Sequence, residues 1–163
     1  PRRPHCPLHS ASRREKGGIR TWRLEGRCGV KNVGIDTNIL LRLIVNDDPA
    51  QRQRVLSFGS LLNVRYRGFV PLVCLVEMDW ALCSQYGFTR QQSIDAIWKI
   101  TRLRGVDVES HETVERALLL AKDRNVDLAD ALIAGQATAH GCIATMTLDK
   151  RAAARVPGME LLA

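Results

Sequence analysis

Four carboxylates fall where a parallel α/β sheet gathers its ligands. Asp36 follows the short apolar run 33–35, and Asp149 lies two residues beyond a strand-like run that ends at Thr147. Glu77 and Asp130 lie in or near the first turns of apolar helical stretches. Ligands of parallel sheets bind beyond the carboxyl ends of the strands. We therefore expect these four acids to converge on one edge of a sheet.

Such a cluster of acids needs positive charge. Two like charges ~4 Å apart repel by ~4 kcal/mol at an effective dielectric of about 20. No histidine and few lysines lie nearby in the sequence to balance them. Hard divalent cations with oxygen ligands, Mg²⁺ or Mn²⁺, fit this donor set best. The sequence therefore predicts a metal site built from carboxylates.

Each acid also has a simpler structural interpretation. Asp36 could cap the helix that follows it, since Asp is a common N-cap residue. Asp130 could favour the positive end of its helix electrostatically, and Asp127 is most simply the N-cap of that same helix. Glu77 interrupts an apolar helical run and has no easy structural role, so it counts most in favour of a functional site.

The expected elements alternate between strand and helix, which predicts an α/β domain with a parallel sheet covered on both faces. Hydrophobic periodicity and turn residues give their bounds. The predicted strands are residues 33–35, 69–73, 106–109, 142–147 and 159–162. The predicted helices are residues 37–44, 49–66, 74–86, 89–103, 110–124, 128–139 and a short basic one after 149. Within these helices, Trp80 and Trp98 fall at core spacing, and the apolar contexts of Cys74, Cys83 and Cys142 suggest reduced core thiols.

Composition and charge place the chain among ordinary globular domains. The 163 residues are 45% hydrophobic and 25% charged, and no apolar run approaches the ~18 residues of a membrane helix. Residues 1–32 carry nine Lys or Arg and two Glu, so they hold the whole net charge of +7, while residues 33–163 carry fifteen of each sign. The high pI therefore describes the tail and not the domain. The lack of a secretory signal and of paired cysteines favours a cytoplasmic protein.

The basic tail, residues 1–32, has almost no aliphatic content and cannot bury enough surface to order itself. We expect a disordered extension, and a start that was set too early, because Val30 stands where a native initiator would precede the first strand. A nucleic-acid-binding arm is the alternative. The folded domain is then expected to span residues 33–163.

The motifs, in order, resemble the PIN-domain ribonucleases, and specifically the VapC-type toxins of bacterial toxin–antitoxin pairs. Each motif is weak alone, but their order and separations over nearly the whole chain after the tail are specific. The matching stretches are Gly34-Ile35-Asp36-Thr37-Asn38-Ile39-Leu40, Asn46-Asp47-Asp48-Pro49-Ala50-Gln51, Val76-Glu77, Asp127-Leu128-Ala129-Asp130-Ala131-Leu132-Ile133-Ala134 and Thr147-Leu148-Asp149-Lys150-Arg151-Ala152-Ala153.

The resemblance implies a three-layer α/β/α sandwich with a parallel sheet, usually dimeric, that cleaves RNA with Mg²⁺ or Mn²⁺. It implies inhibition by a cognate antitoxin protein. By position, the acidic quartet would be Asp36, Glu77, Asp130 and Asp149, and Asn38 and Thr147 would orient the site. Because the domain is electrically balanced, RNA contacts must come from local clusters of cations; we expect these to include Arg42, Lys150 and Arg151.

Other classes also build acidic pockets at strand ends. A phosphoacceptor receiver module needs adjacent acids after its first strand, and Asp36 has no acidic neighbour. A haloacid-dehalogenase-like phosphatase needs Asp-x-Asp, which Asp36-Thr37-Asn38 does not supply. A catalytically silent PIN-like scaffold that only binds partners remains an alternative.

Overall fold

The computed structural model describes residues 15–16, 19–20 and 29–162. Within the tail it places two short antiparallel strands, β1 (Glu15–Lys16) and β2 (Ile19–Arg20). The expected extension and shifted start fall mostly on residues outside this description. The first strand after the tail begins at Lys31, two residues before the predicted strand, because Lys31 and Asn32 pair with the neighbouring strand.

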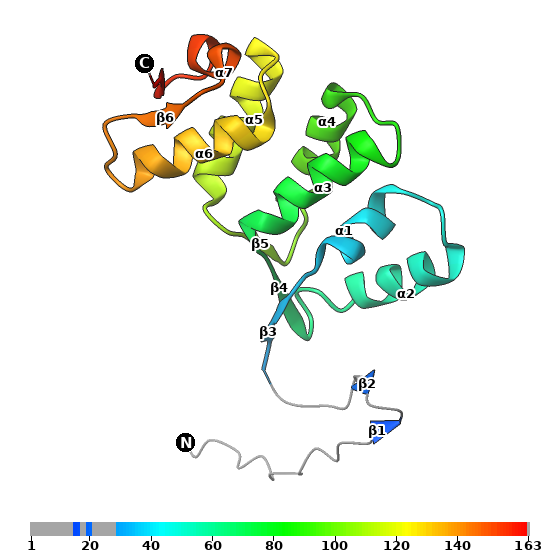
Figure 1. Cartoon of the computed structure of the whole chain (residues 1–163). Coiled ribbons are helices and arrows are strands. Elements are labelled where there is room, and N and C mark those ends of the chain that lie inside the picture. The colour runs from blue at the N-terminus through cyan, green and yellow to red at the C-terminus, as the bar shows by residue number, and fades with distance from the viewer. Residues whose placement is uncertain (1–14, 17–18, 21–28, 163) are drawn as a thin grey trace, which may run out of the picture.

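The strands form two parallel sheets. In one, β3 (Lys31–Gly34), β4 (Tyr66–Val70) and β5 (Val106–Val108) lie in the order β3-β4-β5. In the other, β6 (Thr145–Thr147) pairs with β7 (Met159–Leu161). Parallel strands joined through helices confirm the predicted α/β, PIN-like fold class. Figure 1 shows β6 well separated from β3, so the strands do not form one continuous sheet.

Helices connect the strands in sequence, and their start signals are the ones that the sequence carries. The Thr89–Gln92 capping box is present, with each side chain bonded to the other residue's backbone. Pro49 opens its helix behind the N-cap Asp48. The helices are α1 (Thr37–Ile44), α2 (Pro49–Gly59), α3 (Leu72–Ser84), α4 (Arg90–Thr101), α5 (His111–Arg124), α6 (Leu128–Ala139) and α7 (Lys150–Arg155).

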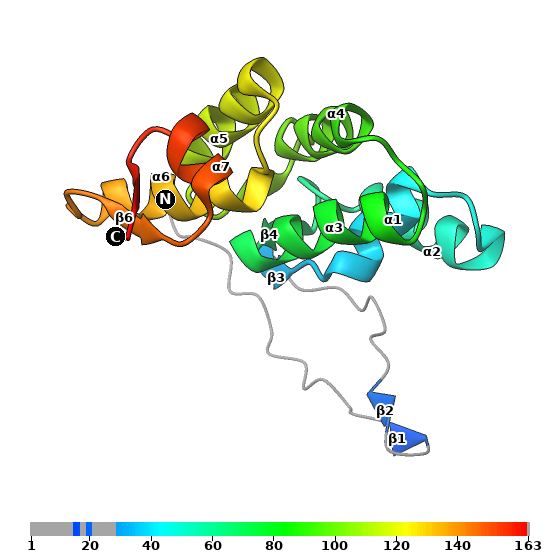
Figure 2. The same ribbon diagram turned by 45° about the horizontal axis from the view of Figure 1, so that its top comes forward.

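One hydrophobic core runs through the domain. Helix α3 contributes Leu75, Met78 and Leu82, all fully buried. Helix α5 packs against α4 and α6, and the buried Leu118 and Leu132 join that part to the same core. Figure 2 shows α5, α6 and α7 grouped at one end of the molecule. The packing fixes the N-terminus of α6, which carries Asp130, relative to α3, which carries Glu77.

The β3-β4-β5 sheet has two unlike faces. Val70 and Val108 point into the core and are buried. Residues on alternate positions of a strand point to the opposite face, which here carries Arg67, Phe69 and Asp107. Phe69 is 42% exposed, and Arg67 and Asp107 form an exposed ion pair across the strands. This face is therefore accessible, and the helices α1, α3 and α4 contribute to the core on the other side.

Several predicted bounds are wrong for local reasons. The second strand is Tyr66–Val70 and not 69–73, because Pro71 has no N–H for a sheet and instead serves as the N-cap of α3. Helix α2 therefore ends at Gly59, seven residues early, to leave chain for that strand. The strand predicted at 142–147 is reduced to Thr145–Thr147.

Two predictions of burial are also wrong. Trp80 lies on the outer side of α3 and is 61% exposed, although its spacing is that of a core residue. Cys74 is buried as expected, whereas Cys83 and Cys142 are exposed. Trp98 is partly buried against the core, with the Arg102 guanidinium 4.7 Å from its ring centre.

Candidate active site

Asp36 lies two residues beyond the end of β3 and is the N-cap of α1. Its carboxylate accepts a hydrogen bond from the Asn38 side-chain amide at 3.0 Å and a longer one, 3.4 Å, from the Asn38 backbone N–H. The structure therefore confirms that Asp36 caps α1. This capping role does not compete with a functional one, because a capping carboxylate stays exposed and points outward from the helix end.

Glu77 lies one turn into α3, on the exposed side of that helix and not in its buried core as the apolar sequence around it suggested. Its Oε2 accepts a 2.5 Å hydrogen bond from the hydroxyl of Thr37, the first residue of α1. This contact places Glu77 beside the N-terminus of α1 and therefore beside Asp36. Sequence reasoning missed Thr37; the available signal was a hydroxyl directly following the first acid.

Asp149 repeats the arrangement of Asp36 in the other sheet. It lies two residues beyond the end of β6 and is the N-cap of α7, where it accepts hydrogen bonds from the backbone N–H groups of Arg151 and Ala152 at 2.7 and 3.1 Å. The Thr147 hydroxyl accepts a 3.0 Å hydrogen bond from the Asp149 backbone N–H. Thr147 thus holds the turn that carries the acid.

Asp130 lies in the first turn of α6, whose N-cap is Asp127 as predicted. Burial, together with the neighbouring carboxylates of Asp127 and Asp149, raises the pKa of Asp130. The guanidinium of Arg90 opposes this rise, and it forms a 3.3 Å ion pair with Asp127. The carboxylates of Asp130 and Asp149 are therefore close enough for their charges to interact.

Besides the contact between Thr37 and Glu77, a polar contact between Ser93 and Asp79 joins α4 to α3. Ser93, which is fully buried, donates a 2.5 Å hydrogen bond from its hydroxyl to Asp79. Burial raises the pKa of Asp79, and the Ser93 hydrogen bond acts against that rise. The sequence suggested a solvated Asp79, because nothing in its spacing shows that a serine fourteen residues away will face it.

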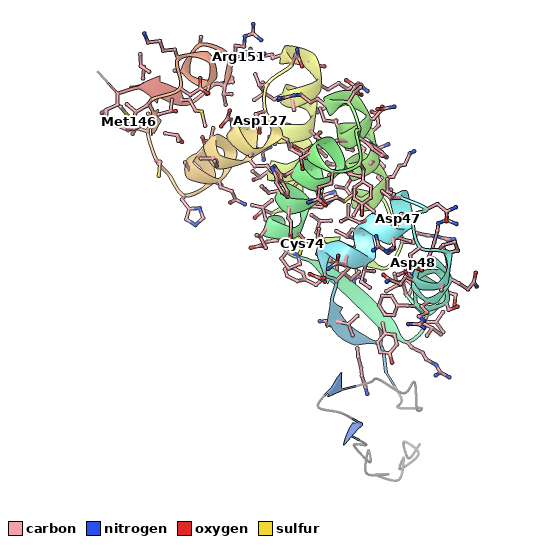
Figure 3. All side chains as sticks on the ribbon, turned by 45° about the vertical axis from the view of Figure 1, so that its right-hand side comes forward. Asp47, Asp48, Cys74, Asp127, Met146 and Arg151 are labelled. Atoms are coloured by element: carbon pink, nitrogen blue, oxygen red, sulfur yellow. The ribbon has the colours of Figure 1, made fainter. Side chains whose placement is uncertain are left out.

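The structure brings the four acids together as two pairs. Asp36 and Glu77 lie at the N-terminus of α1, and Asp130 and Asp149 lie where α6 approaches β6. Among the described residues, no three acidic, histidine or cysteine side chains lie close enough together to hold one metal ion. In Figure 3, Asp127 and Arg151 lie in one part of the molecule and Asp47 and Asp48, near α1, in another.

The three cations expected to contact RNA differ in their surroundings. Arg42 is largely buried and forms a 3.0 Å ion pair with Asp47, and its Nε donates to Gln51. Its Nε and Nη1 therefore already have partners within the chain. Lys150 and Arg151 are exposed at the start of α7, directly after Asp149.

Two surface cavities of the described part lie away from the four acids. One, of about 370 Å³, lies on the exposed face of the β3-β4-β5 sheet around Arg67 and Asp107. The other, of about 520 Å³, lies between α5 and α6 and includes Arg116 and Thr138. Neither of these two cavities has an acid of the quartet in its lining.

A family model described as "PIN domain" matches residues 33–158. This chain belongs to the PIN-domain family. The match covers both halves of the acidic quartet, from Asp36 to Asp149, and confirms the family that the sequence motifs resemble. PIN domains are in general nucleases that use divalent metal ions.

One solved structure similar to this PIN-domain chain is a "Toxin-antitoxin complex from Klebsiella pneumoniae". The two chains are 19% identical, and the match covers 80% of this chain and 95% of that one, with a TM-score of 0.28. No curated protein matches this chain. None of the described helices is long and apolar enough to cross a membrane.

The donor set of the PIN-domain site has the right chemistry for a hard divalent cation. All four side chains offer anionic oxygens, which Mg²⁺ and Mn²⁺ prefer. Burial, and then the neighbouring carboxylates of Asp127 and Asp149, raise the pKa of Asp130, and a bound cation would act against that rise. Asp130 with Asp149, and Asp36 with Glu77, would each offer an ion two carboxylates, because no three of the described acids lie close enough together to hold one ion.

Proposed function

We propose that this PIN-domain chain is a divalent-metal-dependent endoribonuclease and the toxin of a toxin–antitoxin pair. The observation that carries the proposal is a repeated local unit. In β3–Asp36–α1 and in β6–Asp149–α7, a parallel strand ends, an acid follows two residues later, and that acid caps the next helix. This unit places an exposed carboxylate at the end of each of two parallel strands, where ligands of such sheets bind.

The proposed reaction is hydrolysis of an RNA phosphodiester bond by in-line attack of water. Divalent ions held by carboxylates activate the attacking water and stabilise the leaving oxygen. Asp36 and Asp130 are the proposed main ligands, and Glu77 and Asp149 complete the shell. Asn38 orients Asp36 through its side-chain amide, and Thr147 fixes the turn of Asp149.

The proposed path of the RNA backbone passes the start of α7. Lys150 and Arg151 are exposed there and directly follow a proposed ligand. Each contact between a cation and a phosphate contributes about 0.7 to the slope of log affinity against log salt for single strands. Replacing both cations would flatten that slope by roughly one to two units if both contact phosphates.

The proposed partners follow from the same assignment. Toxin nucleases of this kind act in the cytoplasm, as homodimers, and are neutralised by a cognate antitoxin protein. We propose the same three properties here, on the resemblance of the motifs alone. A short upstream reading frame that encodes a DNA-binding protein would support the antitoxin.

The test is cleavage of an end-labelled RNA of mixed sequence by the full chain, with Mn²⁺ and with a chelator. Wild type should cleave only with the ion, and Asp36→Asn should reduce cleavage by roughly 10²-fold or more. The matched control is Asp107→Asn, which also removes an exposed strand carboxylate but lies among the residues that line the sheet-face cavity, away from the quartet. That variant should cleave as wild type does.

A silent scaffold that only binds partners gives a different result. Such a protein would be folded, would show no cleavage with any divalent ion, and would not distinguish the two variants. Cleavage that persists in the chelator, or that runs at the wild-type rate in Asp36→Asn, would overturn the metal-dependent mechanism itself.

A further inference from the structure

Thr37 is a buried hydroxyl at the centre of the first acid pair. It is the first residue of α1 and only 4% exposed, although both of its neighbours, Asp36 and Asn38, are exposed. Burying a hydroxyl costs free energy unless it finds a partner. The partner here is Glu77 Oε2, 2.5 Å away and forty residues along the chain.

The contact ties a flexible side chain to a rigid one. A glutamate has three rotatable bonds and, on the exposed side of a helix, many accessible rotamers. Thr37 is β-branched and has a restricted χ1 angle, so its hydroxyl is held firmly by α1. The hydrogen bond therefore orients the Glu77 carboxylate, and it uses Oε2 while Oε1 accepts no hydrogen bond from the described residues.

The same short segment also carries Asp36 and its own orienting residue. The Asn38 amide donates to the Asp36 carboxylate, and the Thr37 hydroxyl donates to Glu77. The three consecutive residues 36–38 thus supply one acid and fix the directions of two. Because Thr37 directly follows Asp36, its hydrogen bond holds the Glu77 carboxylate next to the segment that carries Asp36.

We propose that Thr37 is a positioning residue, which holds the Glu77 carboxylate in the orientation that binds the divalent ion. This inference rests on the proposed function. Hydrogen-bonded partners of metal ligands typically contribute 10–100-fold to metal affinity. A merely structural Thr37, one that only joins α1 to α3, would change stability and leave the affinity for the ion unaltered.

The test measures binding of Mn²⁺ alone, as the rise in melting temperature of the full chain during a Mn²⁺ titration, with cleavage as a second readout. Thr37→Val keeps the shape and removes the hydroxyl, and it should raise the Mn²⁺ concentration at half-maximal shift by about 10-fold. Thr37→Ser restores the hydroxyl and should stay within about 2-fold of wild type. If Thr37→Val does not fold, Thr37→Ala replaces it, since it also lacks the hydroxyl.

Two controls separate a role in orientation from a role in packing. Thr101→Val removes another buried hydroxyl, one that donates to the Trp98 carbonyl in its own helix, and should leave the Mn²⁺ midpoint unchanged. In a Glu77→Gln background, Thr37→Val should have no further effect on that midpoint, because the group that it orients is no longer a carboxylate ligand.

The outcomes are distinct. An equal Mn²⁺ midpoint for wild type and the variant without the hydroxyl overturns the role of Thr37 and leaves the proposed function standing. A wild type that shows neither a Mn²⁺-dependent shift nor cleavage overturns the proposed function, and the inference with it. A weakened midpoint that serine does not restore assigns the loss to packing and also overturns the inference.

Discussion

The two acid pairs are built on the same local unit but are set in different surroundings. At α1, Asp36 and Glu77 each accept a side-chain hydrogen bond, from Asn38 and Thr37. At α6 and α7, Asp149 accepts hydrogen bonds from backbone N–H groups, whereas burial, and then the carboxylates of Asp127 and Asp149, raise the pKa of Asp130. Both carboxylates of the first pair accept hydrogen bonds from uncharged side chains, whereas Asp130 of the second pair is partly buried beside like charges.

The difference shows that the position of a carboxylate relative to a helix N-terminus decides how well its charge is stabilised. A carboxylate at a helix N-terminus receives N–H donors and the positive end of the helix dipole. Asp130, inside the first turn of α6, receives less of this, and Arg90 acts on it from α4 while paired to Asp127. We therefore expect the second pair to respond more strongly to an added cation.

The largest expected effect is on cleavage, and it tests whether the pairs act as one site. Asp36→Asn in the first pair and Asp130→Asn in the second should each reduce cleavage of RNA by roughly 10²-fold or more. Residues that act as a unit are not additive, so the double variant should be no worse than either single one. If the gel assay shows that the double variant is reduced by the product of the two single-variant factors, the pairs are two independent sites.

The second prediction concerns the distance between the pairs. A single site would require β6 to approach β3, and in the described part of the chain neither strand has a partner on its second edge. Mn²⁺ at about 100 times its dissociation constant should stabilise the protein by about 2.7 kcal/mol. It should also slow amide hydrogen exchange in residues 31–34 and 145–147. Stabilisation without slower exchange at β3 would confine the ion to the second pair.

A smaller effect is expected at the contact that joins α3 to α4, the helices between the pairs. Ser93→Ala leaves the Asp79 carboxylate without its donor and should cost about 1.5–3 kcal/mol of unfolding free energy, measured in urea. Ser57→Ala removes an exposed hydroxyl that bonds only its own helix, and it should change little. Equal losses would show that the Asp79 contact is not special.

The smallest effect is a dependence on pH. Burial raises the pKa of Asp79 above its ordinary value, so the native state holds this proton more tightly than the unfolded state does. Its contribution to stability is therefore full below the ordinary pKa and is lost as pH rises through the raised one. With a chelator present, the urea midpoint of Asp79→Asn should change less between pH 4 and 7 than that of wild type. An equal change in the two proteins would show that Asp79 does not cause the pH dependence.

Local signals predicted the elements that carry the site. The Thr89–Gln92 capping box, the Asp127 N-cap and the apolar stretch of α6 gave bounds that the structure reproduces, because those signals act within one or two turns of helix. The predicted strand at 69–73 was wrong because the apolar run continues past Pro71, where the backbone changes from strand to helix. Apolar content alone does not mark that change.

The sequence by itself determined the family, and it placed Asp36 and Asp149 directly after strands, since an acid that follows a strand and caps the next helix is specified by neighbouring residues. Only the tertiary structure decided what faces each acid. The Thr37 hydroxyl meets Glu77 and the Ser93 hydroxyl meets Asp79 across 40 and 14 residues, and Arg90 reaches Asp127 from another helix. These contacts depend on how the helices pack, and that packing depends on all residues of the core together. Local sequence patterns therefore do not predict them.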